Sequence, residues 1–176
     1  YSNAVFLKKL SGIDVSYYQG TIEWDTVKAQ NISFVFIKAT EGITITDRKF
    51  QENWYHSKRV GIVRGAYHFF RPNIDGREQA LLFLKTVNFE QGDILPVIDV
   101  EYTRVYRSCR RSYYISNLNK FIKEVELQTG KKPIIYTSPY FWDRYYGPYI
   151  KIDNHHLWLA SYTAEPILST YFKEHT

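Results

Sequence analysis

Two carboxylates stand two residues apart at the end of a short apolar run near the middle of the chain. Residues 95–100 follow the turn-forming pair Gly92-Asp93 and are rich in β-branched side chains, which predicts a buried strand. Because strand side chains alternate between faces, Asp99 and Glu101 are expected on one face, with Cα atoms roughly 6.6 Å apart at ~3.3 Å per residue. Like charges this close raise each other's pKa, which suits acid–base chemistry. One acid at a strand end is ordinary, but two on one face indicate a functional site.

Alternating strands and helices must position this pair. Apolar, β-branched runs predict strands at 12–16, 34–42, 62–70, 95–100, 133–137 and 157–162. Helical spacing of apolar residues predicts helices at 22–30, 50–59, 77–87, 113–129 and 138–146. This order indicates an α/β fold with parallel strands joined by right-handed crossovers. The 176 residues suffice for one domain but are few for an eight-stranded α/β barrel, which takes ~250.

Further acids stand near other strand ends, where a parallel barrel collects its functional groups. Asp14 lies at the end of the first strand, although it could instead cap the element that follows. Glu41 lies near the end of the second. Lys38 and Glu41 differ by three positions, so alternation predicts that they face different sides of the strand. We therefore assign Glu41 to the site and Lys38 to a structural ion pair.

Aromatic residues make up 18% of the chain and include sixteen tyrosines, which is unusually many. Tyrosine combines an apolar face with a hydroxyl group, a combination suited to stacking on sugar rings and hydrogen-bonding to their hydroxyls. Tyr67, Tyr136 and Trp158 lie near strand ends and are candidate walls of a sugar cleft. Each could instead belong to the core, and this alternative is strongest for Trp158 because it lies within an apolar strand.

The formal net charge of +5 favours a polyanionic partner such as a bacterial cell wall. Basic residues form no long stripe, and their distribution fits a solvent-exposed face better than a nucleic-acid-binding surface. The densest group consists of Arg104, Arg107, Arg110 and Arg111. We expect no nucleic-acid partner.

Metal and membrane chemistry are not expected either. The single Cys109 excludes an intrachain disulfide and a cysteine-based metal site, and the adjacent His155 and His156 lack the spacing of a metal-binding pair. We predict no metal, no cofactor and a monomer. No apolar run approaches the ~18 residues of a membrane span. The sequence shows no secretory leader, and residues 1–10, with the vector-like Ser2-Asn3-Ala4, are treated as an extension outside the fold.

Six stretches, in this order, resemble glycoside hydrolase family 25, the Chalaropsis-type lysozymes. They cover about residues 11–166. The matching stretches are Gly12-Ile13-Asp14-Val15-Ser16 with Gln19-Gly20, Phe36-Ile37-Lys38-Ala39-Thr40-Glu41-Gly42, Gly65-Ala66-Tyr67-His68-Phe69, Pro96-Val97-Ile98-Asp99-Val100-Glu101, Ile135-Tyr136-Thr137 and Leu157-Trp158-Leu159-Ala160-Ser161-Tyr162.

The resemblance implies a TIM-like barrel of the (β/α)5(β)3 type, forming a single catalytic domain over residues 11–176. It also implies hydrolysis of the β-1,4 bond between N-acetylmuramic acid and N-acetylglucosamine in peptidoglycan. Glu101 would be the proton donor, Asp99 would stabilise the 2-acetamido group or a water, and Asp14 would support the charge network. The family's Trp-Gln strand and its last, aspartate-bearing strand have no counterpart here, so we expect a C-terminally incomplete barrel.

The sequence leaves the reaction mechanism and the activity itself open. Carboxyl groups about 5–5.5 Å apart suit a retaining mechanism and ~6.5–9.5 Å an inverting one, and the i, i+2 spacing fits between them. A substrate-assisted route through the acetamido group is the third possibility, and we favour it. The missing strands also allow a non-catalytic glycan-binding barrel, and a chitin-like polymer is an alternative substrate. A muramidase would be secreted or attached to the cell surface.

Overall fold

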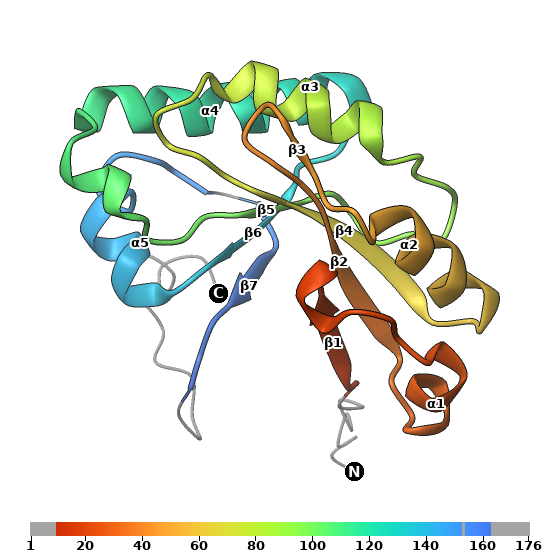
Figure 1. Ribbon diagram of the computed structural model, residues 1–176. Helices are drawn as coiled ribbons and strands as arrows, with labels where there is room; N and C mark the ends of the chain where they lie inside the picture. Colours follow the sequence, from red (N-terminus) through yellow and green to blue (C-terminus); the bar gives the residue numbers. More distant parts are fainter. Residues whose placement is uncertain (1–9, 153, 163–176) are drawn as a thin grey trace, which may run out of the picture.

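The computed structural model describes residues 10–152 and 154–162, which form an α/β fold around one curled sheet (Figure 1). Its parallel strands follow the order β1-β2-β4-β5-β6-β7, and the short β3 pairs antiparallel with β2. The strands are β1 Gly12–Val15, β2 Phe34–Glu41, β3 Ile45–Thr46, β4 Val63–Phe69, β5 Val97–Asp99, β6 Ile134–Thr137 and β7 Leu157–Leu159. The helices are α1 Trp24–Ala29, α2 Phe50–Arg59, α3 Gly76–Thr86, α4 Arg111–Thr129 and α5 Pro139–Tyr145.

Five strand–helix units followed by β7 confirm the predicted α/β class. Within the described residues, β1 and β7 end the sheet and do not pair, so the barrel is open. The predicted extension over residues 1–10 lies outside the described residues except for Leu10, and so does the C-terminal end of the predicted domain, residues 163–176. Three elements were not predicted from the sequence: β3 and two 3-10 helices, Tyr17–Gln19 and Arg104–Arg107.

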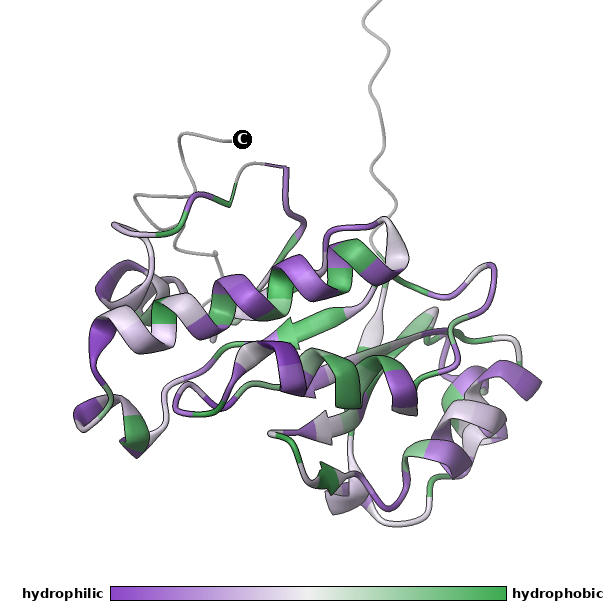
Figure 2. Ribbon diagram, turned by 90° about the horizontal axis from the view of Figure 1, so that it is seen from above, coloured by the Kyte–Doolittle hydropathy of each residue, from purple (hydrophilic) through white to green (hydrophobic). Residues whose placement is uncertain are grey.

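Helices α3 and α4 lie side by side across the outer face of the sheet (Figures 1 and 2). Their contact is close because α3 begins at Gly76, where a Cβ atom would meet the Asn117 carbonyl oxygen of α4 at 1.7 Å. The Asn117 side chain donates a hydrogen bond from Nδ2 to the Pro72 carbonyl at 3.0 Å, which ties α4 to the loop after β4. Because glycine has no side chain, Gly76 allows the two helices to approach this closely.

A polar network lies buried between the sheet and α3. His68 of β4 is fully buried and hydrogen-bonds to Thr40 Oγ1 at 2.7 Å and to Gln79 Oε1 at 3.1 Å. Burial lowers the pKa of His68 to about 4, so the ring is neutral at physiological pH. Gln79 also bonds the backbone of Arg71 and Ile74 and thereby fixes the loop that follows β4. His68 is thus a structural residue of the core.

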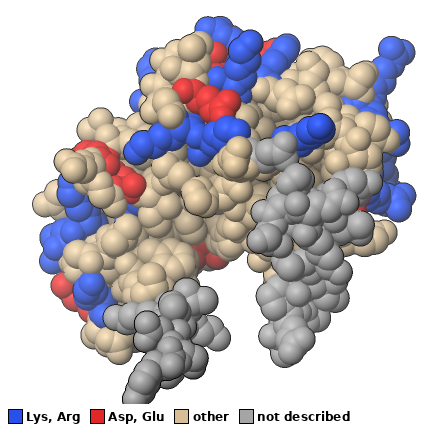
Figure 3. Space-filling view, turned by 180° about the vertical axis from the view of Figure 1, so that it is seen from behind, with Lys and Arg blue, Asp and Glu red and all other residues tan. Residues whose placement is uncertain are grey.

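The surface agrees with the charge pattern of the sequence. On the face shown in Figure 3, basic side chains are scattered rather than gathered in one stripe. Among the described residues, no helix is long and apolar enough to cross a membrane.

Candidate active site

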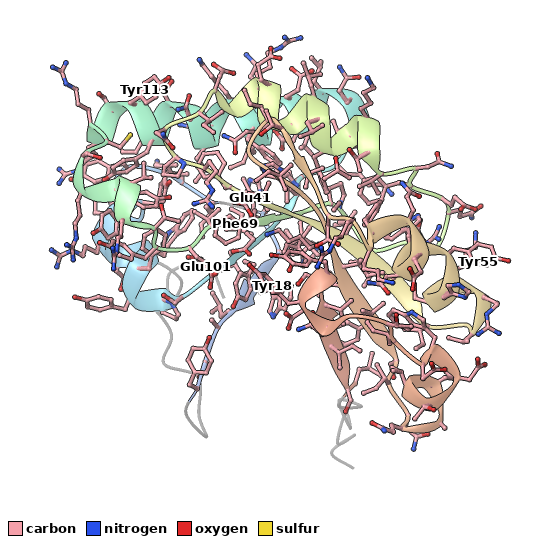
Figure 4. The ribbon with its side chains drawn as sticks, viewed as in Figure 1. Tyr18, Glu41, Tyr55, Phe69, Glu101 and Tyr113 are labelled. Atoms are coloured by element: carbon pink, nitrogen blue, oxygen red, sulfur yellow. The ribbon has the colours of Figure 1, made fainter. Side chains whose placement is uncertain are left out.

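A cavity of about 240 Å³ opens at the carboxyl ends of the parallel strands. Six of the seven residues predicted for the site line it, all except Glu41. Its lining comprises Asp14, Ser16, Tyr18, Lys38, Tyr67, Phe69, Asp99, Glu101, Tyr136 and Trp158. In Figure 4, Tyr18, Phe69 and Glu101 lie together in the middle of the molecule, while Tyr55 and Tyr113 lie at its periphery.

Strand register explains why residues far apart in sequence meet here. Phe69 of β4 pairs with Asp99 of β5, Asp99 with Tyr136 of β6, and Tyr136 with Trp158 of β7. Paired residues in neighbouring parallel strands point to the same side of a sheet, so these four side chains form one row. The row faces the inside of the curled sheet, and Glu101 follows two positions after Asp99.

Asp99 is the most buried acid of the cavity, with 7% of its surface exposed. Its Oδ1 atom has no hydrogen-bond partner within the described part of the chain. Burial, followed by the charge of Glu101, raises the pKa of Asp99 well above its ordinary value. An orphaned buried oxygen is uncommon in proteins and requires an explanation, of which a catalytic role is one.

Glu101 is half-buried, and its pKa is also raised, chiefly by burial. A hydrogen bond from Tyr136 lowers the pKa and the charge of Asp14 raises it, and the net shift is upward. Because two interacting carboxyls titrate as a unit, the pair retains a proton at a pH where exposed carboxyls are ionised. The arrangement can therefore both donate a proton and hold a negative charge.

The prediction that Lys38 and Glu41 face different sides of β2 is wrong. Lys38 pairs with Tyr67 and Glu41 with Phe69, but the register skips one residue between Lys38 and Thr40. This bulge inserts one extra residue, so the alternation changes phase and both side chains lie on the inner side of the sheet. Their contact gives an ion pair of 2.7 Å between Lys38 Nζ and Glu41 Oε2.

Glu41 lies behind the cavity wall rather than in it. Lys38 reaches the cavity, and Glu41 bonds both Lys38 and the guanidinium of Arg71, whose Nε lies 2.9 Å from Glu41 Oε1. Burial alone would raise the pKa of Glu41, but the hydrogen bonds from Lys38 and Arg71 outweigh it, and the pKa is lowered. Glu41 is thus a charged carboxylate that orients the lysine at the site.

The aromatic side chains that form the cavity walls also belong in part to the core, an alternative that the sequence left open. The Trp158 ring stacks on Phe36 with centroids 4.3 Å apart and meets Tyr136 at 4.5 Å, yet it also lines the cavity. Burial and the neighbouring acids raise the pKa of Tyr67 and of Tyr136, so both hydroxyls stay protonated and remain hydrogen-bond donors. These rings combine a flat face with a polar edge at one site.

Sequence reasoning missed four lining residues, of which Tyr18 is the most exposed at 75%. A capping box between Ser16 and Gln19 and a hydrogen bond of 2.9 Å from the Tyr17 amide to Asp47 hold its 3-10 turn. The signal was present, because the turn directly follows the strand that carries Asp14. Phe69 was signalled by its two-residue spacing from Tyr67. The other two missed residues are Ser16 and Lys38.

No group of three or more His, Cys, Asp or Glu that could hold a metal ion occurs among residues 10–152 and 154–162. The cavity is lined by carboxylates, aromatic rings, one serine and one lysine.

Comparison with known proteins shows the family of the chain. The model of "Glycosyl hydrolases family 25" matches residues 13–175. The chain is 40% identical over 158 residues to "Uncharacterized protein YegX" of Escherichia coli CFT073, covering 87% of this chain and 56% of that protein. It is 37% identical over 144 residues to "Lysozyme M1" of Streptomyces globisporus, covering 76% of this chain and 48% of that protein. The chain therefore spans about half the length of these curated relatives.

A solved structure gives the same result at the level of the fold. The family 25 glycosyl hydrolase of Bacillus anthracis superposes with a TM-score of 0.80 at 34% identity, covering 92% of this chain and 74% of that one. From the family match over most of its length and this structural similarity, the chain belongs to glycosyl hydrolase family 25.

Proposed function

We propose that this chain is a lysozyme, a 1,4-β-N-acetylmuramidase that hydrolyses the bond between N-acetylmuramic acid and N-acetylglucosamine in peptidoglycan. The observation that supports it most is the cavity in which Asp14, Asp99 and Glu101 meet at the carboxyl ends of a curled parallel sheet. That edge is where parallel α/β barrels carry their chemistry. Membership of family 25 and the similarity to a protein named lysozyme support the same reaction.

Glu101 is the proton donor in this proposal. Cleavage of a glycosidic bond requires an acid that is still protonated near neutral pH, and burial raises the pKa of Glu101 in that direction. Glu101 is also the more accessible member of the pair, because Asp99 is nearly covered. Its carboxyl group can therefore reach the oxygen of the leaving sugar.

Asp99 acts beside it on the 2-acetamido group of the substrate, or on a water molecule. Its unpartnered Oδ1 is available to an N–H or O–H donor that a bound sugar or water brings. A substrate-assisted reaction would use this contact to orient the acetamido oxygen toward the anomeric carbon. Asp14 contributes negative charge that favours the positive character of the transition state.

The aromatic side chains and Lys38 bind the glycan. Tyr67, Tyr136 and Trp158 offer faces for sugar rings, while the two hydroxyls and the Lys38 ammonium offer donors for acetyl and hydroxyl oxygens. Because its substrate is the cell wall, we further propose that the protein acts as a monomer outside the cytoplasm, secreted or at the cell surface.

The test is loss of turbidity of a peptidoglycan suspension, measured for the native chain and for Glu101→Gln. The substitution keeps the size and hydrogen bonding of the side chain but removes the proton, so lysis should fall at least a hundredfold. Glu23→Gln is the matched control, since Glu23 is exposed directly before α1 and does not line the cavity. Unchanged lysis by Glu101→Gln would refute the assignment of the acid.

A non-catalytic glycan-binding barrel is the second candidate, and the open edge between β1 and β7 in the described residues favours it. Such a protein would sediment with peptidoglycan but release no new reducing ends. Release of reducing ends by the native chain would exclude it.

A further inference from the structure

A second hollow, of about 470 Å³, lies among residues that follow the carboxyl ends of β5 and β6. Its walls come from the segment after β5 and from α5, the helix that follows β6. The side chains that matter for its chemistry are Tyr102, Arg107, Tyr140, Phe141, Arg144 and Tyr145. None of the functions assigned above uses it.

Residues that are neighbours in the sequence border the two hollows. Tyr102 follows Glu101 directly, and consecutive Cα atoms are about 3.8 Å apart. Ser138, which also lines the second hollow, follows two residues after Tyr136 of the first. Both hollows are therefore bordered by the same two segments, those that follow β5 and β6, and lie within reach of one extended ligand.

The floor of the second hollow is a packed aromatic cluster. The Tyr106 ring is 5% exposed and stacks on Tyr102 with centroids 6.3 Å apart, and its hydroxyl hydrogen-bonds to that of Tyr146 at 2.7 Å. Phe141 and Tyr145 pack at 4.9 Å in the same cluster. Buried ring contacts of this kind hold side chains in single rotamers, so the floor of the hollow is preformed.

The charge of the hollow has one sign. Its lining contains two arginines and no acid, and none of the ion pairs found among the described residues involves Arg107 or Arg144. Arg107 uses Nε to donate a hydrogen bond of 2.9 Å to the Tyr102 hydroxyl, which orients its guanidinium. A guanidinium has five donors, so the terminal nitrogens keep donors for a ligand. The Arg144 guanidinium lies 5.9 Å from the centroid of the Tyr145 ring.

Two arginines over a tyrosine floor match a carboxylate carried by a sugar. A guanidinium recognises a carboxylate through two parallel hydrogen bonds, and an exposed tyrosine offers a face for a sugar ring. The Tyr140 side chain, 75% exposed at the mouth, is such a face. Neutral amino-sugar polymers such as chitin carry no carboxylate, whereas every muramic acid residue carries a lactyl group that ends in a carboxyl or in a peptide.

We propose that the hollow between the Arg104–Arg107 turn and α5 binds the lactyl or peptide carboxylate of a muramic acid residue next to the cleaved bond. This inference rests on the proposed function and extends it. Arg107 and Arg144 select carboxylate-bearing glycan over neutral glycan, while Asp99 and Glu101 do the chemistry.

Binding of soluble muropeptides to the Glu101→Gln protein, measured by calorimetry, tests the proposal. The probe is a tetrasaccharide muropeptide, compared with the same molecule after its carboxyl groups have been converted to amides. We expect the amidated ligand to bind roughly tenfold more weakly, the loss typical of one charge-assisted hydrogen bond. Adding Arg107→Gln or Arg144→Gln should weaken the acidic ligand by a similar factor and leave the amidated ligand unchanged.

Two further variants serve as controls for this binding experiment. Arg104→Gln removes the same charge from the same short turn, but Arg104 does not line the hollow, so it should bind both ligands like the parent. Arg107→Lys keeps the charge but loses the paired donors, and it should recover only part of the affinity. Equal binding of both ligands, or an equal loss in Arg104→Gln, would overturn the proposal.

The outcome is separable from that of the proposed function. A native chain that releases reducing ends but does not distinguish the two ligands would overturn the carboxylate site and keep the lysozyme. A chain that releases none but still distinguishes them through Arg107 and Arg144 would overturn the reaction and keep the site.

Discussion

Replacing Gly76 by Ala should destabilise the protein, although Ala is the better helix former. Gly76 is the first residue of α3, and an added Cβ would lie 1.7 Å from the carbonyl oxygen of Asn117 and 3.0 Å from the amide nitrogen of Phe121. Ordinary contact between such atoms is about 3.5 Å. The two helices would therefore have to separate by roughly 1.8 Å at this point. Both contacts are backbone atoms, so no side-chain rotation relieves them.

The magnitude follows from two opposed effects. Ala gains up to about 1 kcal/mol over Gly in a helix, while overpacking a rigid contact costs typically 1–3 kcal/mol and sometimes more. With backbone on both sides the upper end applies, and we expect a net loss of about 2 kcal/mol in the free energy of unfolding. For a domain of this size that corresponds to a fall of roughly 4–8 °C in Tm.

Urea and thermal unfolding followed by circular dichroism measure this effect. Gly130→Ala is the matched control, because Gly130 ends α4 at φ 69° with no other atom within 4 Å of the added Cβ. It should lose about 1 kcal/mol from backbone strain alone. A Gly76→Ala protein as stable as the native chain, or more stable, would refute the close approach of α3 and α4.

Three other substitutions test the site and its support. Asp99→Asn should abolish lysis yet raise Tm at pH 7. Burial raises the pKa of Asp99 in the folded protein, so the charged form of Asp99 opposes folding above the unfolded pKa of ~3.9. The gain in Tm should therefore vanish below that pH. Glu41→Gln should lower kcat/KM by misplacing Lys38, and it should also lower stability at pH 7. Because the pKa of Glu41 is lowered in the folded protein, the difference in stability from the native chain should shrink in acid, where the native carboxylate is protonated. Urea unfolding at pH 7 and pH 3 would show this. Gln79→Leu removes the hydrogen bonds that Gln79 makes to His68 Nε2 and to three backbone groups, and it should cost roughly 3–5 kcal/mol by urea unfolding. A loss below about 1 kcal/mol would contradict the network.

The sequence predicts the parallel sheet well because its strands are apolar runs bounded by turns, and such patterns need only local information. Asp99 illustrates this, since an apolar strand followed by an i, i+2 acid is readable without any tertiary knowledge. The β3 strand, Ile45–Thr46, was not predictable, because two residues carry no periodic pattern and the strand exists only through pairing with β2.

The error over Lys38 and Glu41 has a specific physical cause. Alternation holds only in an unbroken strand, and the bulge between Lys38 and Thr40 depends on how β2 pairs with β4, which the sequence does not state. The second hollow was equally out of reach. Arg107 and Arg144 are 37 positions apart in the sequence and meet only because α5 folds against the segment after β5.

The most direct test of the account is the identity of the sugar at the reducing ends of digested peptidoglycan. The digest is reduced with borohydride, hydrolysed and analysed by mass spectrometry. The native chain should yield reduced muramic acid, and Glu101→Gln, shown to be folded by its unfolding curve, should yield none above background. Reduced glucosamine in place of reduced muramic acid, or equal yields from both proteins, would contradict a muramidase whose acid is Glu101.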